Sequence, residues 1–321
     1  MCSENVVREV PKIDFSALHP DQPGSRGWAE VRAQVAEALR TYGWFEAVYE
    51  KVTPELKEKV FGSAVKELFN LPLEAKLRNV SDKPFHGYLG QIPFLRYESL
   101  AILHPHEPDA IKAFTDLLWP QGSSDTFCEP VCGFSKLLVE LDQMVRMMVL
   151  ESLGVEKHYD SLMKTNKFLL RLSEYPAPEE DEEKKKMLGL VPHRDKNTLA
   201  IVCQNQVDGL DMQTQDGKWI PAVPSPSSVI VIAGDTLRAW TNGQMYSPLH
   251  TVNVGGSVTR YSAILFSLPE DELMIEPLPE LVDETHPALF KPYTYSEYVR
   301  FCFSEGRDAE CQLDAYCRIA P

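Results

Sequence analysis

Short apolar segments separated by turn dipeptides fill the second half of the chain, and this pattern restricts the fold more than any other feature. The segments are five to eight residues long and are apolar or alternate between apolar and polar residues. They do not alternate with helical segments, which argues against a doubly wound parallel sheet. Closely spaced short strands instead predict a β-sandwich or jelly roll. The segments are 168–175, 198–204, 210–214, 228–233 and 261–268, and turns are predicted at Asp208-Gly209, Asp216-Gly217, Asn242-Gly243 and Gly255-Gly256.

The first half of the chain is predicted to be mostly helical. Apolar residues recur at helical spacing over residues 27–42, and Thr53 followed by Pro54 is a typical start of a second helix. We expect a helix-rich region over residues 1–165 that packs on a strand-rich core at 166–321, the two forming one structural unit. The remaining expected elements are a strand at 44–49, an amphipathic helix at 137–153 and a helix at 293–303 near the C-terminus.

The composition narrows the choice of partners. The 321 residues carry a formal net charge of −15, and an acidic surface repels phosphate backbones and anionic lipids. The first residues lack the apolar core of a signal peptide, and no segment approaches the ~18 apolar residues of a membrane span. We therefore expect a cytoplasmic monomer whose partner is a small-molecule substrate and not nucleic acid or a membrane. The seven scattered cysteines predict reduced thiols, and the charged stretch 176–186 predicts an exposed loop.

Three residues in the strand-rich half form a candidate metal site. His193 and Asp195 are two positions apart at what we interpret as the start of a strand, so their side chains share one face and can hold one ion. His250 comes 57 residues later (250 − 193 = 57) at the start of another strand pattern, which is far enough for antiparallel strands to return beside the first. Two imidazoles and one carboxylate form the facial triad of non-haem Fe(II) enzymes, which leaves positions open for a 2-oxo acid and O2.

Arg260 and Ser262 lie ten and twelve residues after His250, on the next predicted strand. Their spacing places both side chains on one side of that strand. A guanidinium group beside a hydroxyl suits the distal carboxylate of a dicarboxylic co-substrate. An arginine buried near the metal also needs an anionic partner, because an unpaired buried charge is very costly.

Other catalytic motifs are excluded. His193-Arg194-Asp195 matches the HRD of a protein-kinase catalytic loop, but that loop requires Asn five residues after the Asp, where this chain has Ala200. The DFG and glycine-rich kinase motifs are absent from the sequence, as are the GxSxG, GxGxxG and GxxxxGK[ST] motifs.

Along almost its whole length the sequence resembles the plant soluble 2-oxoglutarate- and Fe(II)-dependent dioxygenases. The His-x-Asp, His and Arg-x-Ser positions match the family's motif residue by residue, and Tyr175-Pro176 matches a Tyr-Pro whose hydroxyl contacts the co-substrate in this family. Further matching segments are Val10-Pro11-Lys12-Ile13-Asp14-Phe15, Tyr42-Gly43-Trp44-Phe45, and the stretch from Gly234-Asp235 through Trp240-Thr241-Asn242-Gly243 to His250-Thr251-Val252.

Within that family the chain is similar to the branch of the glucosinolate side-chain (AOP-like) dioxygenases and steroidal glycoalkaloid hydroxylases. The closer likeness is carried by Lys83-Pro84-Phe85-His86-Gly87-Tyr88, Trp119-Pro120-Gln121-Gly122 and Leu281-Val282-Asp283-Glu284. Three positions depart from the family pattern and none removes a metal ligand. Val48-Tyr49-Glu50 replaces Asn-His-Gly, Ser173 replaces an Asn that bears on co-substrate positioning, and Arg194 replaces Thr or Ser between the first two ligands.

The resemblance implies a double-stranded β-helix, a distorted jelly roll, with a helical N-terminal region. It implies Fe(II), 2-oxoglutarate and O2, with ascorbate as the reductant. In the family, 2-oxoglutarate is converted to succinate and CO2 while a substrate C–H bond is oxidised, usually by hydroxylation. The metal ligands are then His193, Asp195 and His250, and 2-oxoglutarate is bound by Arg260, Ser262 and Tyr175.

Aromatic residues are our candidates for the substrate pocket, which suits a small hydrophobic or aromatic plant metabolite or hormone. Those expected to cover the mouth of the barrel are Phe85, His86, Tyr88, Phe94 and Trp119, and those expected to line it from the strands are Phe168, Trp240 and Phe266.

Two alternative functions stay open at this point. An Fe(II) oxidase of the same fold would not use 2-oxoglutarate, and Arg260 and Ser262 would then bind a substrate carboxylate. A non-catalytic relative would bind a small molecule on the same scaffold.

Overall fold

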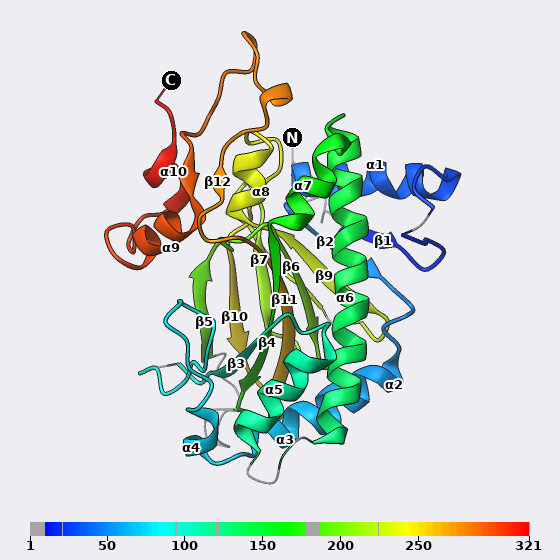
Figure 1. Cartoon of the computed structure of the whole chain (residues 1–321), viewed down its shortest axis with the longest axis vertical. Coiled ribbons are helices and arrows are strands. Elements are labelled where there is room, and N and C mark those ends of the chain that lie inside the picture. Colours follow the sequence, from blue (N-terminus) through cyan, green and yellow to red (C-terminus); the bar gives the residue numbers. More distant parts are fainter. Residues whose placement is uncertain are drawn as a thin grey trace, which may run out of the picture.

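Two facing β-sheets form the centre of the computed structural model (Figure 1). The structure describes residues 10–20, 22–93, 95–119, 122, 124–177, 187–223 and 225–320. Strands of the larger sheet run in the order β1-β2-β9-β6-β11-β4-β3, and each pair is antiparallel except β1 with β2. The strands are β1 (Lys12–Asp14), β2 (Trp44–Val48), β3 (Glu98–Leu103), β4 (Asn166–Tyr175), β6 (Leu199–Gln204), β9 (Ser228–Ala233) and β11 (Arg260–Pro269).

The smaller sheet covers one face of the larger one. Its order is β5-β10-β7-β8, with β5 (Met187–His193), β10 (His250–Val254), β7 (Leu210–Gln213) and β8 (Trp219–Pro221). Buried side chains from both sheets pack together between them, including Trp44, Tyr175, Val202, Met212 and Val252. We call this covered face of the larger sheet the inner face. The architecture confirms the predicted jelly roll.

Each of the five strands predicted from the second half of the chain is present. The predicted segment 228–233 coincides with β9, and the other four differ from β4, β6, β7 and β11 by one or two residues at an end. Three of the four predicted turns hold a residue in the left-handed region, with φ of +82° at Gly217, +49° at Asn242 and +77° at Gly256, whereas Asp208-Gly209 has no residue with positive φ. Strands β3, β5 and β8 of the two sheets do not appear among the predicted ones.

Helices cover the opposite, outer face of the larger sheet. The predicted helix at 27–42 is α1 (Arg26–Thr41), and α6 (Asp125–Ser152) begins well before the predicted 137 and stands along one side of the sheets in Figure 1. The Thr53 hydroxyl caps its helix as expected, accepting from the Leu56 amide at 3.2 Å. The other helices of this layer are α2 (Pro54–Lys57), the π-helix η1 (Glu58–Ala64), α3 (Val65–Phe69), α4 (Leu73–Lys76), α5 (Pro108–Leu118), η2 (Glu156–His158) and α7 (Tyr159–Lys164).

The main hydrophobic core lies between this helical layer and the sheet. Phe134 and Leu141 of α6 pack in one cluster with Leu170 of β4 and Leu265 of β11, and all four are fully buried. Each such side chain contributes about 1.5–3 kcal/mol by leaving water. Successive residues of a strand point to opposite faces of the sheet. Because Leu170 and Leu265 face the helices, the residues next to them in β4 and β11 face the smaller sheet.

The C-terminal part of the chain closes one end of the sheets (Figure 1, upper left). It contains α8 (Asp235–Trp240), β12 (Met274–Ile275), η4 (Pro279–Leu281), β13 (Tyr293–Thr294), α9 (Tyr295–Phe303) and α10 (Gln312–Cys317). Its aromatic residues pack with Leu169 and Leu268 of the inner face. The predicted helix at 293–303 is thereby confirmed as α9, preceded by a short strand.

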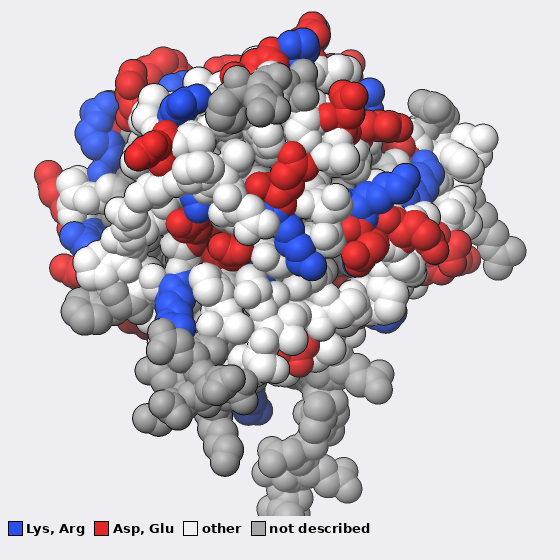
Figure 2. All heavy atoms as spheres, turned by 90° about the horizontal axis from the view of Figure 1, so that it is seen from below, with Lys and Arg blue, Asp and Glu red and all other residues white. Residues whose placement is uncertain are grey.

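The surface mixes both charges. Figure 2 shows acidic and basic side chains interspersed on one face of the molecule, in keeping with the acidic net charge of −15. None of the described helices is long and apolar enough to span a membrane. Six cysteines of the described ranges are free thiols, at positions 128, 132, 203, 302, 311 and 317. Most of the predicted charged loop, residues 178–186, lies outside the described residues.

Candidate metal and co-substrate site

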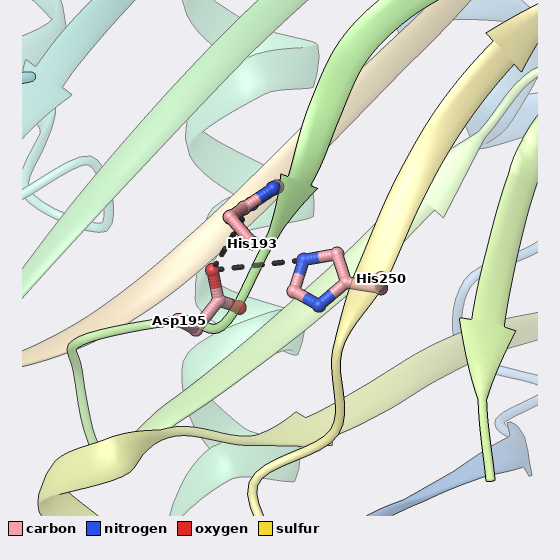
Figure 3. Close-up of side chains that lie close together, drawn as sticks. All are labelled: His193, Asp195 and His250. Carbon is pink, nitrogen blue, oxygen red and sulfur yellow. Dashed lines mark ion pairs between the residues drawn. The ribbon is translucent and has the colours of Figure 1, made fainter. Parts of the chain in front are cut away.

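The three predicted metal ligands meet between the two sheets (Figure 3). His193 ends β5 and lies directly opposite His250, the first residue of β10. Asp195 follows two residues later in the loop, so the predicted strand start at His193 is wrong, because β5 precedes the ligand pair instead of following it. The ligand atoms all lie within 4.8 Å of one another. Asp195 Oδ1 is 3.7 Å from His193 Nε2 and 3.8 Å from His250 Nε2.

Backbone carbonyls orient both imidazoles. Nδ1 of His193 lies 2.8 Å from the Val191 carbonyl, and Nδ1 of His250 lies 3.3 Å from the Pro248 carbonyl. A carbonyl only accepts, so each Nδ1 carries the proton and each Nε2 presents its lone pair toward Asp195. Neutral imidazoles with free Nε2 atoms are the form that binds a divalent metal.

Burial sets the protonation of these groups. His250 is buried, and burial lowers its pKa to about 4. Burial, together with the neighbouring His250, also lowers the pKa of His193, whose side chain keeps 31% of its surface exposed. The pKa of the buried Asp195 carboxyl is raised by burial. A cation bound between the three would offset the cost of burying the Asp195 charge.

The loop that carries Asp195 is fixed against the start of α8. The Asp235 amide donates to the Asp195 carbonyl at 2.8 Å, and the Tyr298 hydroxyl donates to the Asp235 carboxylate at 2.6 Å. Gly234 leaves room for this contact, since a Cβ there would come within 2.0 Å of the Asn197 carbonyl oxygen. Sequence reasoning gave Asp235 and Tyr298 no role in the site.

A second set of polar groups lies at the Tyr175 end of the inner face. Arg260 is 1% exposed, its guanidinium is 4.9 Å from the centre of the Tyr175 ring, and one of its nitrogens donates to Gln204. Its Nε and Nη1 are buried without a partner, as are the hydroxyls of Ser262 and Ser173. Ser262 faces Ser173 across the β11–β4 pair, and Arg260 faces Tyr175.

These unpartnered donors fit an anionic ligand. Buried polar groups almost always have a hydrogen-bond partner, and no Asp or Glu of the described residues forms an ion pair with Arg260. A carboxylate presented to Arg260, Ser262 and Ser173 would satisfy them together. The donor set therefore suits the dicarboxylic co-substrate predicted from the sequence.

Comparisons with known proteins point to the same chemistry. The sequence profile of the 2OG-Fe(II) oxygenase superfamily matches residues 159–269, and that of the N-terminal region of non-haem dioxygenases in morphine synthesis matches residues 10–96. A probable 2-oxoglutarate-dependent dioxygenase of Arabidopsis thaliana, AOP1.2, is 44% identical over 97% of each chain. The chain belongs to the 2-oxoglutarate- and Fe(II)-dependent dioxygenases.

Solved structures of other dioxygenases share the fold. The rice dioxygenase for auxin oxidation is 27% identical with a TM-score of 0.79, over 96% of this chain and all of that one. JOX2, solved with 2OG, Fe and JA, is 26% identical with a TM-score of 0.77, over 97% of this chain and 89% of that one. These likenesses agree with a His-Asp-His site that is compatible with Fe(II).

Some predicted pocket residues of this dioxygenase lie near the space between the two sheets, and the others pack in the hydrophobic clusters outside it. Phe266 and Ile264 both lie on the inner face of β11. β11 has a neighbouring strand on each side, yet both side chains are only half-buried. Phe85 and His86 lie in the segment between α4 and β3, where Phe85 is 46% exposed and its ring lies 4.9 Å from that of Phe303. Of the predicted pocket residues, Phe85, His86 and Phe266 can therefore border a substrate space.

The other candidates pack elsewhere. Phe168 faces the helices from the outer face of β4, because it alternates with inner-face residues, and Trp119 joins the same core and donates to Glu67 at 2.8 Å. Tyr88 also packs against that core, and Trp240 is buried in the C-terminal cluster. We therefore leave these four out of the proposed pocket. Phe94 lies outside the described residues.

Sequence reasoning missed the inner-face polar residues of β3, β4 and β6: Ser99, Arg171 and Gln204. The alternation of Arg171, Ser173 and Tyr175 with Leu170 and Leu172 is the signal that could have found Arg171, because every second residue of a strand shares one face.

Proposed function

We propose that His193, Asp195 and His250 of this dioxygenase hold Fe(II), and that Arg260, Ser262 and Tyr175 hold 2-oxoglutarate, for the hydroxylation of a small organic substrate. The convergence of the three ligand side chains within 4.8 Å carries the proposal. When bound, iron and 2-oxoglutarate supply the oxidising chemistry, in which O2 is consumed and succinate and CO2 are released with the oxidised product.

The residues of the chain then bind and orient. The Nε2 atoms of the two histidines are held toward one carboxylate oxygen by the backbone contacts at Nδ1. Arg260 and Ser262 would fix the distal carboxylate of the co-substrate and thereby direct its 2-oxo acid end toward the metal. The apolar side chains that pack between the two sheets would exclude water from the site.

We propose a small hydrophobic or aromatic plant metabolite or hormone as the substrate. Half-buried apolar residues on the inner face, Ile264 and Phe266, support an apolar pocket. Dioxygenases of similar structure include one for auxin oxidation and one solved with JA. We further propose ascorbate as the reductant and a cytoplasmic monomer as the working form.

The test measures three quantities on the purified protein. Mn(II) binding by electron paramagnetic resonance and 2-oxoglutarate binding by calorimetry report the site, and succinate release with Fe(II), ascorbate and O2 reports turnover. His250→Ala is expected to lose Mn(II) binding and succinate release. His286→Ala, at a 72% exposed histidine side chain, is the matched control and should keep both. Unchanged Mn(II) binding in His250→Ala would contradict the ligand assignment.

One alternative function has a specific basis, since Arg260 and Ser262 would also suit a substrate carboxylate. Product formation by the Fe(II)-loaded protein in the absence of 2-oxoglutarate would favour that oxidase, and a strict requirement for 2-oxoglutarate excludes it.

A further inference from the structure

Arg171 is a buried cation on the inner face that the metal and co-substrate sites do not use. It is 4% exposed and lies in the middle of β4, opposite Ala101 of β3 and Ile264 of β11. Along β4 it lies between Ser173 and Tyr175 of the proposed co-substrate site and Leu169 of the C-terminal cluster. Its side chain therefore borders the same interior as those residues.

Among the described residues, the groups that accept hydrogen bonds from Arg171 are all neutral. Nη1 donates to the Ser99 hydroxyl at 2.5 Å, and Nη2 donates to the backbone carbonyls of Phe85 and Gly87. The phenol of Tyr97 lies beside the guanidinium, whose Cζ is 5.8 Å from the centre of the Phe85 ring. Within the described part of the chain no carboxylate forms an ion pair with it, so among these residues its buried positive charge has no anionic partner.

Lys167 is another cation at an inner-face position of β4, and it has carboxylate partners, as buried cations usually do. Its Nζ lies 2.9 Å from a Glu270 oxygen and 3.0 Å from an Asp271 oxygen. Arg146, buried in the helical layer, is likewise paired with Asp142 at 3.1 Å. Arg171 instead resembles Arg260, whose buried guanidinium also has only a neutral protein partner and which we assign to a carboxylate of the co-substrate.

The two arginines define separate positions for anions. Arg171 faces Ile264, which is four residues from Arg260 on β11, so the backbone positions of the two arginines are roughly 13 Å apart along the strand. Arg260 is held by Gln204 and the Tyr175 ring, whereas Arg171 is held by Ser99 and the segment around Phe85. The two guanidinium groups therefore have different hydrogen-bond partners, and the contacts proposed for 2-oxoglutarate at Arg260, Ser262 and Tyr175 do not include Arg171.

We propose that Arg171 binds a terminal oxyanion of the substrate, a carboxylate or a sulfonate or sulfate group, whose apolar body packs on Phe85, Ile264 and Phe266. The proposal rests on the proposed function and narrows its substrate class to small organic anions. A planar guanidinium group binds such oxyanions through two parallel hydrogen bonds, and that of Arg171 is already buried away from water. The Phe85 carbonyl now accepts a hydrogen bond from Nη2 of Arg171. When the ligand binds, the segment around Phe85 would either lose this hydrogen bond to the ligand or shift to make room for it.

The experiment compares anions with neutral analogues on the Mn(II)- and 2-oxoglutarate-loaded protein. The probes are 3-phenylpropanoate, indole-3-acetate, cyclohexaneacetate and 3-phenylpropane-1-sulfonate, with the methyl ester of each carboxylate, and dissociation constants are measured by ligand-observed NMR. At least one anion is expected to bind roughly ten- to hundredfold more tightly than its neutral counterpart, the ratio that one charge-assisted hydrogen bond provides. Comparing 3-phenylpropanoate with the sulfonate separates the two kinds of oxyanion.

Variants then assign the preference to Arg171. Arg171→Gln should abolish the preference for anions while Mn(II) and 2-oxoglutarate bind as in the wild type, and Arg171→Lys should keep part of it. Arg40→Gln, at an exposed arginine of α1, is the control and should behave as the wild type. The wild-type comparison needs no variant, so it decides the question even if Arg171→Gln does not fold.

Failure of this inference is distinguishable from failure of the proposed function. If Mn(II) and 2-oxoglutarate bind but anions and esters bind equally, or no anion of the panel binds, the role of Arg171 is refuted and the dioxygenase site stands. An anion preference that persists in Arg171→Gln also refutes it. If Mn(II) and 2-oxoglutarate themselves do not bind to the wild type, the proposed function fails.

Discussion

His193 and His250 lie directly opposite each other across the β5–β10 pair, with ring centroids 4.2 Å apart. The register of two short strands thus brings together ligands that are 57 residues apart in the sequence (250 − 193 = 57). Because β5 is an edge strand, its last residue reaches the metal position from the rim of the smaller sheet while His250 does so from within it. The geometry of the site therefore depends on this register and on the loop that carries Asp195.

Removing the carboxylate ligand should greatly weaken metal binding without a loss of stability. Asp195→Ala removes a buried charge that burial disfavours, so we expect its free energy of unfolding without metal to equal or exceed that of the wild type. Mn(II) affinity should fall by at least about a hundredfold, as expected when one of three ligands is lost. Calorimetry and urea unfolding measure both, and Mn(II) binding at wild-type affinity would exclude Asp195 as a ligand.

Tyr298→Phe should weaken the metal site from a distance. The Tyr298 hydroxyl donates to the buried Asp235 carboxylate at 2.6 Å, and Asp235 holds the backbone of Asp195. We expect a loss of about 1–3 kcal/mol in stability and a decrease of roughly tenfold in Mn(II) affinity. Tyr316→Phe, in the same aromatic cluster, is the control, since no hydrogen bond of its hydroxyl occurs among the described residues. Equal effects of the two variants would contradict this positioning role.

Gly234→Ala should displace the loop that carries Asp195. The added Cβ would lie 2.0 Å from the Asn197 carbonyl oxygen and 3.1 Å from that of Asp195, and backbone atoms cannot move aside cheaply. We expect lower Mn(II) affinity and a lower melting temperature. Gly133→Ala on α6 is the matched control, because nothing lies within 4 Å of its Cβ position and alanine stabilises a helix by about 0.5–1 kcal/mol. A Gly234→Ala protein with normal Mn(II) binding would show that the close packing is not required.

Arg260→Lys should weaken the binding of 2-oxoglutarate without affecting the metal. Lysine keeps the charge but loses the planar fork that holds a carboxylate with two parallel bonds. We expect the dissociation constant of 2-oxoglutarate to rise by roughly tenfold in Arg260→Lys and by roughly a hundredfold in Arg260→Gln. Calorimetry on the Mn(II)-loaded protein measures both, with Arg40→Lys as an exposed control. Unchanged affinity in Arg260→Gln would place the co-substrate elsewhere.

The strands and the ligand types of the site were predictable because both leave local signals. The strands β6 and β9 are nearly continuous in apolar residues, β4 and β11 combine apolar with polar residues, and spacings of two place Arg260 with Ser262 on one side. The triad was also found from spacing. Its position relative to β5 was not, because Gly189 and Pro192 interrupt the apolar residues of this edge strand, and both residue types weaken a strand prediction.

Positions that depend on three-dimensional neighbours could not be predicted from the sequence. Phe168 and Phe266 both belong to apolar strands, yet one faces the helices and the other the interior, and only the pairing of β4 with β11 under α6 decides which. That no carboxylate of the described residues pairs with Arg171 likewise depends on its neighbours in β3 and β11 and in the segment around Phe85. The hydrogen bond of Tyr298 with Asp235 joins residues 63 positions apart, with no signal in either segment.

The helix-rich and strand-rich parts should not fold separately, as expected for one structural unit. Leu170 and Leu265 of the sheet share a core with Phe134 and Leu141 of α6, and β3 forms an edge of the same sheet. A fragment of residues 166–321 would expose this apolar face, so we expect it to aggregate or to show no cooperative thermal unfolding. In the full chain Phe134→Ala should cost about 3–5 kcal/mol, whereas Leu117→Ala, at a 43% exposed side chain, should change stability by about 0.5 kcal/mol or less. A soluble fragment with a cooperative transition would instead establish 166–321 as an independent domain.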